Sequence, residues 1–522
     1  MPVDAPAPSA PSDLLGYAAL REHLGLACPP PRVESHVGAV RGTTRTVHAG
    51  GSEVVRYRAA QFRSYTTTVA SMLDFALRHE PLDLTVWAAM VDQEAARHAL
   101  RSTIVHWLED TPQSRYARIA GHLYEWLTDE QLDYRLPAGA ARVPVLDPDA
   151  YFTGPAVRDP RYGVVHNLIG SRRLSPIVRR TPALAALDSH ALHERIVHVL
   201  ETVDPGILDR ALSYLYLAET QSSFAIEKEI PDHERREAFR RLLEQAGAPG
   251  RITEDTVVTW QRAIITQALR QEMSYRTKQN WLSLGSSFRA AVDFIPPAPR
   301  DVHELMEGVA DIAGQAAAGQ VDPVIGATCA SFAFVFVHPL LDGNGRLHRF
   351  LLHHVLRQAG ITPRQVVLPL SVALEAHLAE YGAALRRYSQ PRTRLLDYRL
   401  DPDNNTLEVR GPQPAWLYGF FDATELCELI ARAIERSLTR DLPAELAWLR
   451  AYDAAMKNLG FWLDGAQAEL DLLIRLVVQN GGSLSKSRRG RFQRFTDAEI
   501  EKAEAQIRAA FTGWEAQVKL HD

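Results

Sequence analysis

The sequence has little cysteine. Only three cysteines, Cys28, Cys329 and Cys427, occur in 522 residues, and they lie far apart. An odd and scattered set excludes the disulfide framework of small secreted domains. No Cys/His spacing resembles a zinc site. The pattern is typical of a protein that works in a reducing compartment, so we expect this one in the cytoplasm.

Long apolar runs are also missing. The longest, "VIGATCASFAFVFV" at 324–337, falls short of the ~20 residues that span a bilayer, so it predicts a buried helix and no membrane partner. The N-terminal "MPVDAPAPSAPSD" has no charged start and no apolar centre, unlike a signal peptide. Its Pro, Ala and Ser content predicts a disordered tail over residues 1–13.

No excess of one charge sign stands out. The formal net charge is -5, and charged residues make up 23% of the chain, so composition indicates neither a nucleic-acid nor a membrane partner. One local exception is the basic run "SKSRRGRFQR" at 485–494. Such a run is usually a solvated face, and a nucleic-acid surface is the alternative.

Most of the sequence has helical periodicity, for example over 101–132, which predicts a mostly α fold. The stretch 141–160 is rich in Pro, Gly and Asp and predicts a loop or boundary. Between 391 and 422, "RLLDYRL", "DPDNN" and "TLEVRG" predict a small β-hairpin. Two helix starts have capping-box spacing, Asp301 with Glu304 and Thr496 with Glu499.

The stretch "HPLLDGNGRLHRF" at 338–350 concentrates chemistry. Gly343-Asn344-Gly345 allows backbone angles that are closed to other residues, and a strong helical pattern follows it. A glycine-rich turn at a helix N-terminus is suited to binding phosphate. Arg346 and Arg349 share one helix face, so both can reach the same anion.

Two further residues complete this stretch. Asp342 lies beside the predicted phosphate site, where holding Mg²⁺ is the usual reason for an acid. His338 has a pKa range suited to taking a proton from an attacking hydroxyl. The set of cradle, metal ligand, counter-charges and base predicts transfer of a nucleotide phosphate group.

The stretch resembles the Fic signature, H-x-F-x-[D/E]-G-N-G-R-x-x-R, with Leu340 as the one departure where the family has Phe. The resemblance implies a helical protein that transfers AMP from ATP to a hydroxyl of a target Ser, Thr or Tyr, or to itself, with release of pyrophosphate. His338 would be the general base and Asp342 the Mg²⁺ ligand. The nucleotide phosphates would be bound by Gly343, Asn344, Gly345, Arg346 and, at the γ-phosphate, Arg349.

A second resemblance lies upstream. "ETQSSFAIEKE" at 219–229 is similar to the family's inhibitory helix, [S/T]-x-x-x-E-[G/N], with Ser223 and Glu227, although Lys228 stands where Gly or Asn is usual. A Glu227 carboxylate paired with Arg349 would occupy the cation that the γ-phosphate needs. A Ser and a Glu four residues apart also occur on many helices by chance.

The segment 276–297 resembles the flap that positions the target by strand addition in this family. A connecting loop is the alternative. Ser283, Ser286 and Ser287 are candidate self-modification sites that no pattern selects. Tyr381 could line the adenine pocket or belong to the core, while His348, His353 and His354 are ordinary helix residues.

These patterns divide the chain into a tail (1–13), an N-terminal accessory domain (14–155), a Fic core (156–400) with its inhibitory helix at about 215–230, and a hairpin with a helical region (401–522). Two other functions stay open. Glu227 could orient a water that removes AMP from a modified protein, or the chain could be a non-catalytic interaction or DNA-binding regulator. An oligomer is compatible with the sequence, which does not name the target.

Overall fold

The computed structural model describes residues 13–47, 52–201, 204–283, 292–401, 404 and 406–519. It is mostly α-helical with small sheets, as expected. The chain forms two compact units. The first contains Met1–Ser189, Gln245–Ile361 and His377–Ala431, and the second contains His190–Glu244, Thr362–Ala376 and Arg432–Asp522. All of the predicted tail except Asp13 lies outside the described residues.

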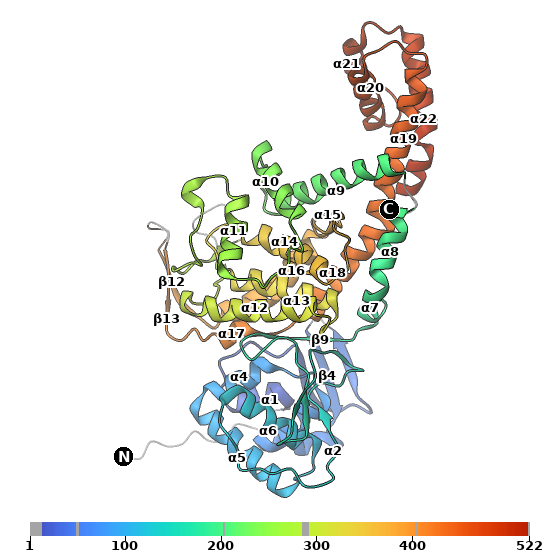
Figure 1. The fold of residues 1–522 in the computed structure, drawn as a ribbon. Coiled ribbons are helices and arrows are strands. Elements are labelled where there is room, and N and C mark those ends of the chain that lie inside the picture. The colour runs from blue at the N-terminus through green and yellow to red at the C-terminus, as the bar shows by residue number, and fades with distance from the viewer. Residues whose placement is uncertain are drawn as a thin grey trace. The chain divides into compact units, whose positions relative to one another are not determined.

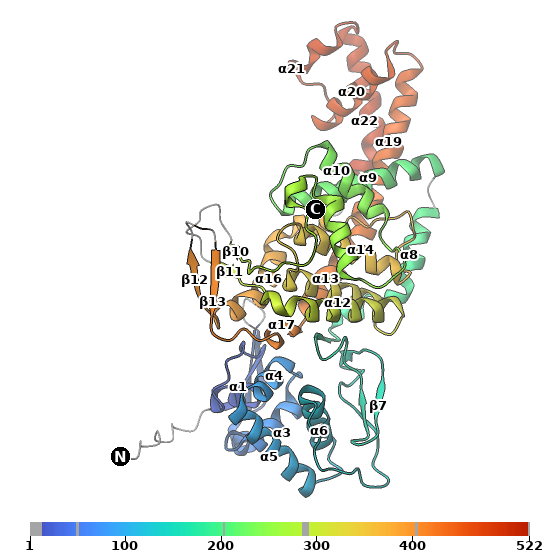
Figure 2. The ribbon, with the colours of Figure 1, turned by 60° about the vertical axis from the view of Figure 1, so that its left-hand side comes forward.

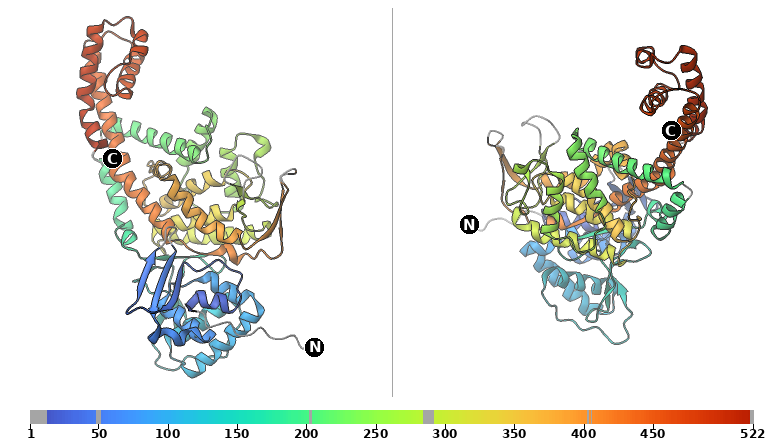
Figure 3. Two further views of the ribbon diagram at one scale, coloured as in Figure 1. Left: turned by 180° about the vertical axis from the view of Figure 1, so that it is seen from behind. Right: turned by 45° about the horizontal axis from the view of Figure 1, so that its top comes forward.

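The first unit begins with a helical cluster that carries a small sheet (Figure 3). The sheet has the order β1-β2-β4-β3, in which β2 and β4 are parallel and the outer strands antiparallel. Trp87 and Tyr17 lie at the centre of the helical core and share a 3.2 Å hydrogen bond. The elements are β1 (Leu14–Leu15), α1 (Gly16–His23), β2 (Val33–Gly38), β3 (Thr44–Val47), β4 (Glu53–Arg58), α2 (Ala59–Phe62), α3 (Val69–His79), α4 (Leu84–Asp92), α5 (Glu94–Asp110) and α6 (Arg115–Thr128).

The stretch 141–160, expected as a loop, contains three short strands, β5 (Val143–Pro144), β6 (Tyr151–Phe152) and β7 (Val157–Asp159). Strands of two or three residues are too short to show a period of two in the sequence. They join β8 (Val164–His166) and β9 (Ser175–Arg179) in two sheets, β5-β8-β7 and β14-β9-β6. The strand β14 (Phe420–Asp422) pairs with β9 in parallel, so chain from beyond residue 400 completes this sheet.

The central helices of the first unit are packed around α13 (Pro323–Val337), which is the expected buried helix (Figure 1). It contacts α12 (Val302–Ala317) and α14 (Asn344–Gln358). A Cβ on Gly326 would lie 2.5 Å from the Cβ of Ala316, so the close approach of α12 to α13 needs glycine there. α17 (Trp416–Gly419) also contacts α13. The first unit further contains α11 (Glu254–Ile264), α16 (Leu378–Thr393) and most of α18 (Thr424–Arg436), which ends in the second unit.

The expected hairpin forms near the end of the first unit. β12 (Asp397–Asp401) pairs with β13 (Thr406–Arg410) as a two-stranded antiparallel ribbon, visible in Figure 2. The turn predicted from "DPDNN" lies between them, and of its residues only Asp401 and Asn404 are described.

One of the two predicted capping boxes is correct. Before α22 (Asp497–Lys519), the backbone N–H of Thr496 donates to Glu499 Oε2 at 2.7 Å, and Glu499 N–H donates to Thr496 Oγ1 at 3.3 Å. The prediction at Asp301 with Glu304 is wrong, because the Asp301 side chain makes no capping hydrogen bond. Its backbone lies in a 3-10 turn (φ -97°, ψ -7°), whereas a capping side chain needs an extended backbone to reach the first-turn amides.

The second unit is helical. Its elements are α8 (Ser189–Glu201), α9 (Pro205–Ile226), α10 (His233–Glu244), α15 (Leu370–Ala376), α19 (Leu442–Gly460), α20 (Gln467–Gln479), α21 (Lys486–Arg489) and α22. Buried Glu219 of α9 accepts hydrogen bonds from the backbone N–H (2.7 Å) and hydroxyl (2.5 Å) of Ser371, which fixes α15 on α9. The helices α19, α20 and α22 share a separate apolar core. In the described part of the chain no helix is long and apolar enough to cross a membrane.

The helix α9 ends in a Schellman turn. Lys228 N–H donates to Ala225 O at 2.8 Å, and Glu229 N–H donates to Phe224 O at 3.1 Å. Glu227 is the C-cap residue of α9. Lys228 has a φ of 58°, the left-handed region that favours glycine and asparagine. The turn therefore gives a physical reason why Gly or Asn is usual at this position.

Replacing Lys228 with Gly is expected to stabilise the protein by about 1 kcal/mol, because a side chain in the left-handed region costs about 1–2 kcal/mol and glycine pays back part of this in the unfolded chain. Chemical denaturation monitored by circular dichroism measures the change. The matched control is Lys228→Ala, which removes the charge but keeps the Cβ. Equal stabilisation by Ala and Gly would contradict the backbone explanation.

The first unit buries a carboxyl group at the start of α1. Glu80 Oε2 accepts the backbone N–H of Tyr17 at 2.7 Å, and the residue is only 8% exposed. Burial raises the pKa of Glu80 to about 8, well above its usual value near 4.5. The folded protein therefore holds a proton at neutral pH that the unfolded chain releases.

The free energy of unfolding is expected to fall as pH rises from about 4.5 to about 8, by up to about 1.4 kcal/mol per pH unit from this group. Glu80→Gln, which stays neutral, removes this contribution, so the variant loses less stability over the same interval. Denaturant titrations at pH 5 and pH 8 measure it. Glu94→Gln, at an exposed helix start, is the control, and an unchanged slope in Glu80→Gln would refute the assignment.

Candidate active site

The signature residues lie together in the first unit, where α13 ends and α14 begins. The helix α13 starts at Asp322, whose carboxylate accepts the N–H groups of Val324 (3.0 Å) and Ile325 (3.1 Å). It ends at His338, which has a φ of 52° and a ψ of 58°. A left-handed backbone terminates the helix there, and the following Pro339 cannot continue it. The turn thus points the chain toward the glycine-rich segment.

The ring of His338 is oriented by the helix that it ends. Its Nδ1 lies 3.2 Å from Val335 O, and the residue is 8% exposed. A carbonyl oxygen only accepts hydrogen bonds, so this contact assigns the proton of the neutral ring to Nδ1 and the lone pair to Nε2. A histidine in this tautomer is able to accept a proton from a hydroxyl through Nε2.

The loop between His338 and α14 is closed by Asn344. Its Oδ1 accepts the N–H of Leu340 at 3.1 Å, and its Nδ2 donates to Leu340 O at 2.8 Å. Leu340 is fully buried, so the departure from the family's Phe is a loss of core volume and not a change at the surface. Both bonds hold the loop in one conformation.

Gly343 caps α14 with a φ of 91° and a ψ of 0°, which requires glycine. The first intrahelical acceptor is Gly343 O, which receives the N–H of Leu347 at 3.0 Å. The N–H groups of Asn344 and Gly345 therefore have no carbonyl within the helix, and they lie at the positive end of its dipole. This end of α14 is suited to an anion such as phosphate.

Charged side chains surround this helix end. Arg346 and Arg349 are each 2% exposed and arise three residues apart on α14. Asp342 Oδ1 lies 3.2 Å from Arg346 Nη2, and its Oδ2 lies 3.5 Å from Arg270 Nη1. The Asp342 side chain is 33% exposed. Arginines and a carboxylate thus lie close together at the start of α14. A polyphosphate with a bound metal ion would need both, the arginines for its phosphates and the carboxylate for the ion.

Asp342 is a suitable ligand for Mg²⁺. The ion is commonly held by one or two carboxylates together with the phosphates of a substrate. Among the described residues no group of three or more His, Cys, Asp or Glu side chains could hold a metal. A single carboxylate at this helix end would therefore hold the ion only together with the phosphates of a ligand.

Residues from the segment before the flap also form part of the site, and the sequence did not predict them. Glu272 Oε1 accepts the backbone N–H groups of Leu341 (2.8 Å) and Asp342 (3.3 Å). Burial, and to a lesser degree the charge of Asp342, raises the pKa of Glu272. The segment is attached to α11, since Gln261 bonds to Arg270 O (3.0 Å) and Glu272 N–H (3.1 Å).

Arg276, which the sequence did not predict either, holds the turn at His338. Its guanidinium donates to His338 O at 2.8 Å and to Pro297 O at 2.5 Å, and its backbone N–H donates to Pro339 O at 2.8 Å. It is 3% exposed, and burial lowers its pKa to about 10. It therefore binds the turn to the base of the flap. No spacing in the sequence could have indicated contacts across some sixty residues.

The flap has the expected antiparallel base. β10 (Leu282–Ser283) pairs with β11 (Val292–Phe294), and Gln279 Nε2 donates to Pro296 O at 2.9 Å. Ser283 lies on exposed β10. The other two candidate self-modification sites, Ser286 and Ser287, lie outside the described residues.

The other candidate residues, Tyr381, His348 and Ser223, are buried. Tyr381 is 5% exposed on α16, with its ring 6.2 Å from Phe332 and 6.3 Å from His348. His348 contacts Ser331 Oγ at 2.7 Å, and burial lowers its pKa to about 3, as befits a core histidine. Ser223 is buried in α9 of the second unit, which also contains Glu227.

The basic run at 485–494 is partly used within its own helices. Arg489 donates to Asp497 (2.7 Å) and to the main-chain oxygens of Phe492 (2.8 Å) and Phe495 (2.7 Å), and Arg494 donates to Glu469 (3.3 Å). Arg489 and Arg494 therefore have partners within the protein, and their presence in the basic run needs no nucleic acid.

Residues 251–356 match the Fic/DOC family. The chain is similar to "Protein adenylyltransferase fic-1" of Caenorhabditis elegans, with 35% identity over 92 residues, covering 18% of this chain and 17% of the relative. It is also similar to "Protein adenylyltransferase Fic" of Nematostella vectensis, with 30% identity over 113 residues, covering 22% and 24%. The similarity thus spans under a quarter of each relative's length.

Two solved structures are similar in part. A Fic family protein from Desulfovibrio desulfuricans G20 has a TM-score of 0.35 and 16% identity, covering 63% of this chain and 85% of that one. Fic-1 of C. elegans (aa134–508) has a TM-score of 0.30 and 15% identity, covering 73% and 96%. The signature at 338–349 lies within the matched residues 251–356, so this part of the chain is similar to the Fic/DOC family.

Proposed function

We propose that this protein transfers AMP from ATP to a hydroxyl side chain of a target protein, or of itself, and releases pyrophosphate. The observation that supports the proposal is the turn at His338, whose ring Nδ1 lies 3.2 Å from Val335 O and which is followed by the glycine-capped start of α14. The names of the similar adenylyltransferases agree with this chemistry.

In this reaction Nε2 of His338 takes the proton from a Ser, Thr or Tyr hydroxyl of the target. The hydroxyl oxygen forms a bond to the α-phosphorus, and the bond from that phosphorus to the bridging oxygen of the β-phosphate breaks. Backbone N–H groups of Asn344 and Gly345 stabilise the negative charge on the α-phosphate oxygens. Arg346 and Arg349 supply positive charge to the phosphates, Arg349 at the γ-phosphate.

Asp342 would hold Mg²⁺, which neutralises charge on the α- and β-phosphates when it is bound. The carboxylate would have to exchange its 3.5 Å contact with Arg270 for the ion. Tyr381, whose ring is part of the core around His348, is the candidate for contact with adenine. The edge of β10 would pair with an extended target segment and present its hydroxyl to His338.

The proposed activity is held low by Glu227. A carboxylate paired with Arg349 would remove the counter-charge of the γ-phosphate, so ATP would bind poorly or in an unproductive position. Ser223 lies one helical turn before Glu227 and would support that helix end. The Schellman turn after α9 supports this proposal, because Lys228 adopts the left-handed backbone that is favoured by Gly and Asn, the residues usual at this position of the motif.

We place this reaction in the cytoplasm, since all three cysteines are buried and unpaired. The reverse reaction, removal of AMP by a water that Glu227 orients, uses the same residues. The Glu227→Gly variant distinguishes the two reactions, because removal of AMP needs this carboxylate and transfer of AMP does not.

Glu227→Gly is expected to raise incorporation of label from [α-32P]ATP into protein by about tenfold or more, since each 1.4 kcal/mol of recovered nucleotide binding is a factor of ten. Adding His338→Ala should lower the rate by about 100-fold or more, the usual contribution of a general base. Glu229→Gly, two residues further on, is the matched control. A Glu227→Gly variant that labels no protein, or a double variant that labels as well, would refute the proposal.

Arg276→Lys, in the Glu227→Gly background, is expected to lower kcat about tenfold with little change of KM for ATP. Lysine keeps the charge but cannot donate to several carbonyls in one plane, so the histidine turn shifts, and small displacements of a catalytic group are costly. Steady-state kinetics and a melting curve measure both effects. If kcat is unchanged while the protein only loses stability, Arg276 has a structural role alone.

A further inference from the structure

The first unit contains a cavity of about 490 Å³ that is separate from the signature residues 338–349. Most of its lining comes from four stretches of the chain, namely residues 29–33, residues 80–85, the helix α16, and the chain from β14 into α18. The walls include prolines and leucines such as Pro30, Leu82 and Leu426. Its size is within the range of small-molecule sites, and its walls suit an apolar group.

Arginines are unusually frequent in this lining. Arg392 is explained by the fold, because it donates to the main-chain oxygens of Leu417 (2.7 Å), Tyr388 (2.8 Å) and Phe420 (2.8 Å). The other arginines of the lining have no such set of acceptors. They are Arg32, Arg386, Arg387 and Arg394.

Two of these arginines have buried donors without acceptors. The Nε atoms of Arg32 and Arg387 are buried and make no hydrogen bond to any residue that the structure describes. The nearest carboxylate oxygens to Arg32 Nε are 3.8 Å away, on Asp422, and 4.0 Å away, on Glu53. Leaving a buried N–H without an acceptor is unfavourable, so such donors are expected where a ligand or ion supplies the acceptor.

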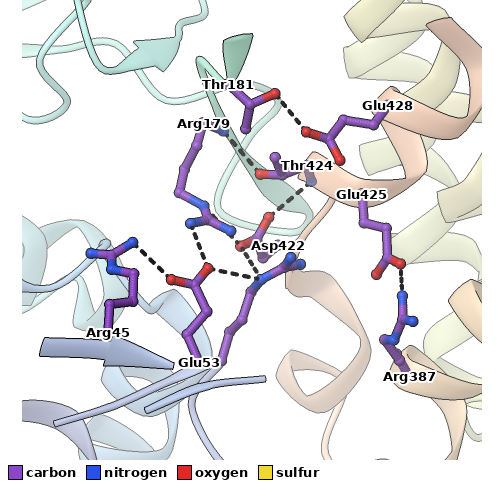
Figure 4. Close-up of polar contacts among 10 residues, drawn as sticks. Arg45, Glu53, Arg179, Thr181, Arg387, Asp422, Thr424, Glu425 and Glu428 are labelled. Carbon is purple, nitrogen blue, oxygen red and sulfur yellow. Dashed lines mark hydrogen bonds and ion pairs between the residues drawn. The ribbon is translucent and has the colours of Figure 1, made fainter. Parts of the chain in front are cut away.

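The neighbouring carboxylates are already engaged, as Figure 4 shows. Glu53 accepts Arg45 at 2.8 Å and Arg179 at 3.2 Å, and Glu425 is paired with Arg387. Glu53 thus accepts hydrogen bonds from two arginines outside the cavity, and the single carboxylate of Glu425 cannot accept from every N–H group of Arg387. The Nε–H groups of Arg32 and Arg387 are therefore left to donate to a ligand in the cavity.

The charges of the lining are unbalanced. Arg32 and Arg387 both line the cavity, and burial, followed by the positive charge of Arg32, lowers the pKa of Arg387. Half-buried Arg386 forms no hydrogen bond or ion pair within the described part of the chain. Among the acids, Glu80 holds its proton at neutral pH because burial raises its pKa to about 8, and Asp83 caps α4 through the N–H groups of Thr85 and Val86.

We propose that this cavity is a second ligand site, which binds a small molecule carrying an oxyanion head, phosphate or carboxylate, on an apolar or aromatic body. The head lies between Arg32 and Arg387 and accepts their Nε–H groups, with Arg386 beside it. The body lies against Pro30, Leu82 and Leu426. Arginine is suited to this task because its planar fork matches both oxyanions. The site does not depend on the proposed AMP transfer.

The test uses the full chain and phenyl phosphate, a probe with both an oxyanion head and an aromatic body. Isothermal titration calorimetry is expected to show saturable binding that weakens at least tenfold in Arg32→Gln and in Arg387→Gln. Benzyl alcohol, of similar shape but uncharged, should not bind. Benzoate in parallel shows whether a carboxylate head is accepted as well as phosphate.

Two variants control for other anion sites. Arg410→Gln, on an exposed strand, and Arg349→Gln, at the start of α14, are expected to bind phenyl phosphate at this cavity as the unchanged protein does. Melting curves identify any variant that fails to fold, and the comparison of phenyl phosphate with benzyl alcohol needs no variant at all. Absence of saturable binding, equal binding of benzyl alcohol, or loss in Arg349→Gln alone would overturn the proposal.

Discussion

The buried guanidinium of Arg276 is the contact on which the geometry of the signature depends. It donates to the carbonyl of His338, while its own backbone N–H holds Pro339, and it also reaches the far side of the flap at Pro297. A histidine with left-handed backbone angles is strained, and such a residue persists only where its surroundings fix it. The helix α13 supplies one support through Val335, and Arg276 supplies the other.

The same turn links three parts of the site. Asn344 closes the loop onto Leu340, Glu272 holds the amides of Leu341 and Asp342, and Gly343 opens α14. Each contact uses backbone groups that an α-helix or a strand would have paired internally. The loop is therefore ordered by side chains from elsewhere, while the first amides of α14 have no acceptor within the helix.

The first unit combines the signature helices with an N-terminal helical cluster through a shared sheet. β14 follows the core in sequence but pairs with β9, which precedes it by more than two hundred residues. The arginine-lined cavity arises beside this junction, because surfaces from both parts meet there without enough acceptors for Arg32 and Arg387. A site of this kind belongs to neither part alone.

The sequence by itself determined the elements whose cause is local. The apolar run 324–337 forms the buried helix, "DPDNN" separates two paired strands, and Thr496 with Glu499 caps α22, because each depends on residues a few positions apart. For the same reason the Gly-Asn-Gly pattern predicted the unusual backbone angles at Gly343, where α14 begins. At Asp301 the local pattern was misleading, since a 3-10 turn before the helix changed the backbone angles that capping requires.

Only the tertiary structure decided which distant side chains complete the site. Arg276 and Glu272 lie in a segment without regular hydrophobic period. Their partners are backbone groups some sixty to seventy residues away, and every residue has such groups, so no residue type in the sequence marks these partners. The strands of two or three residues at 143–159 likewise form through pairing that no period of so few residues indicates. Charge has the same limit: a sequence shows that Arg32 and Arg387 are cations, but only packing decides that their donors are buried without acceptors.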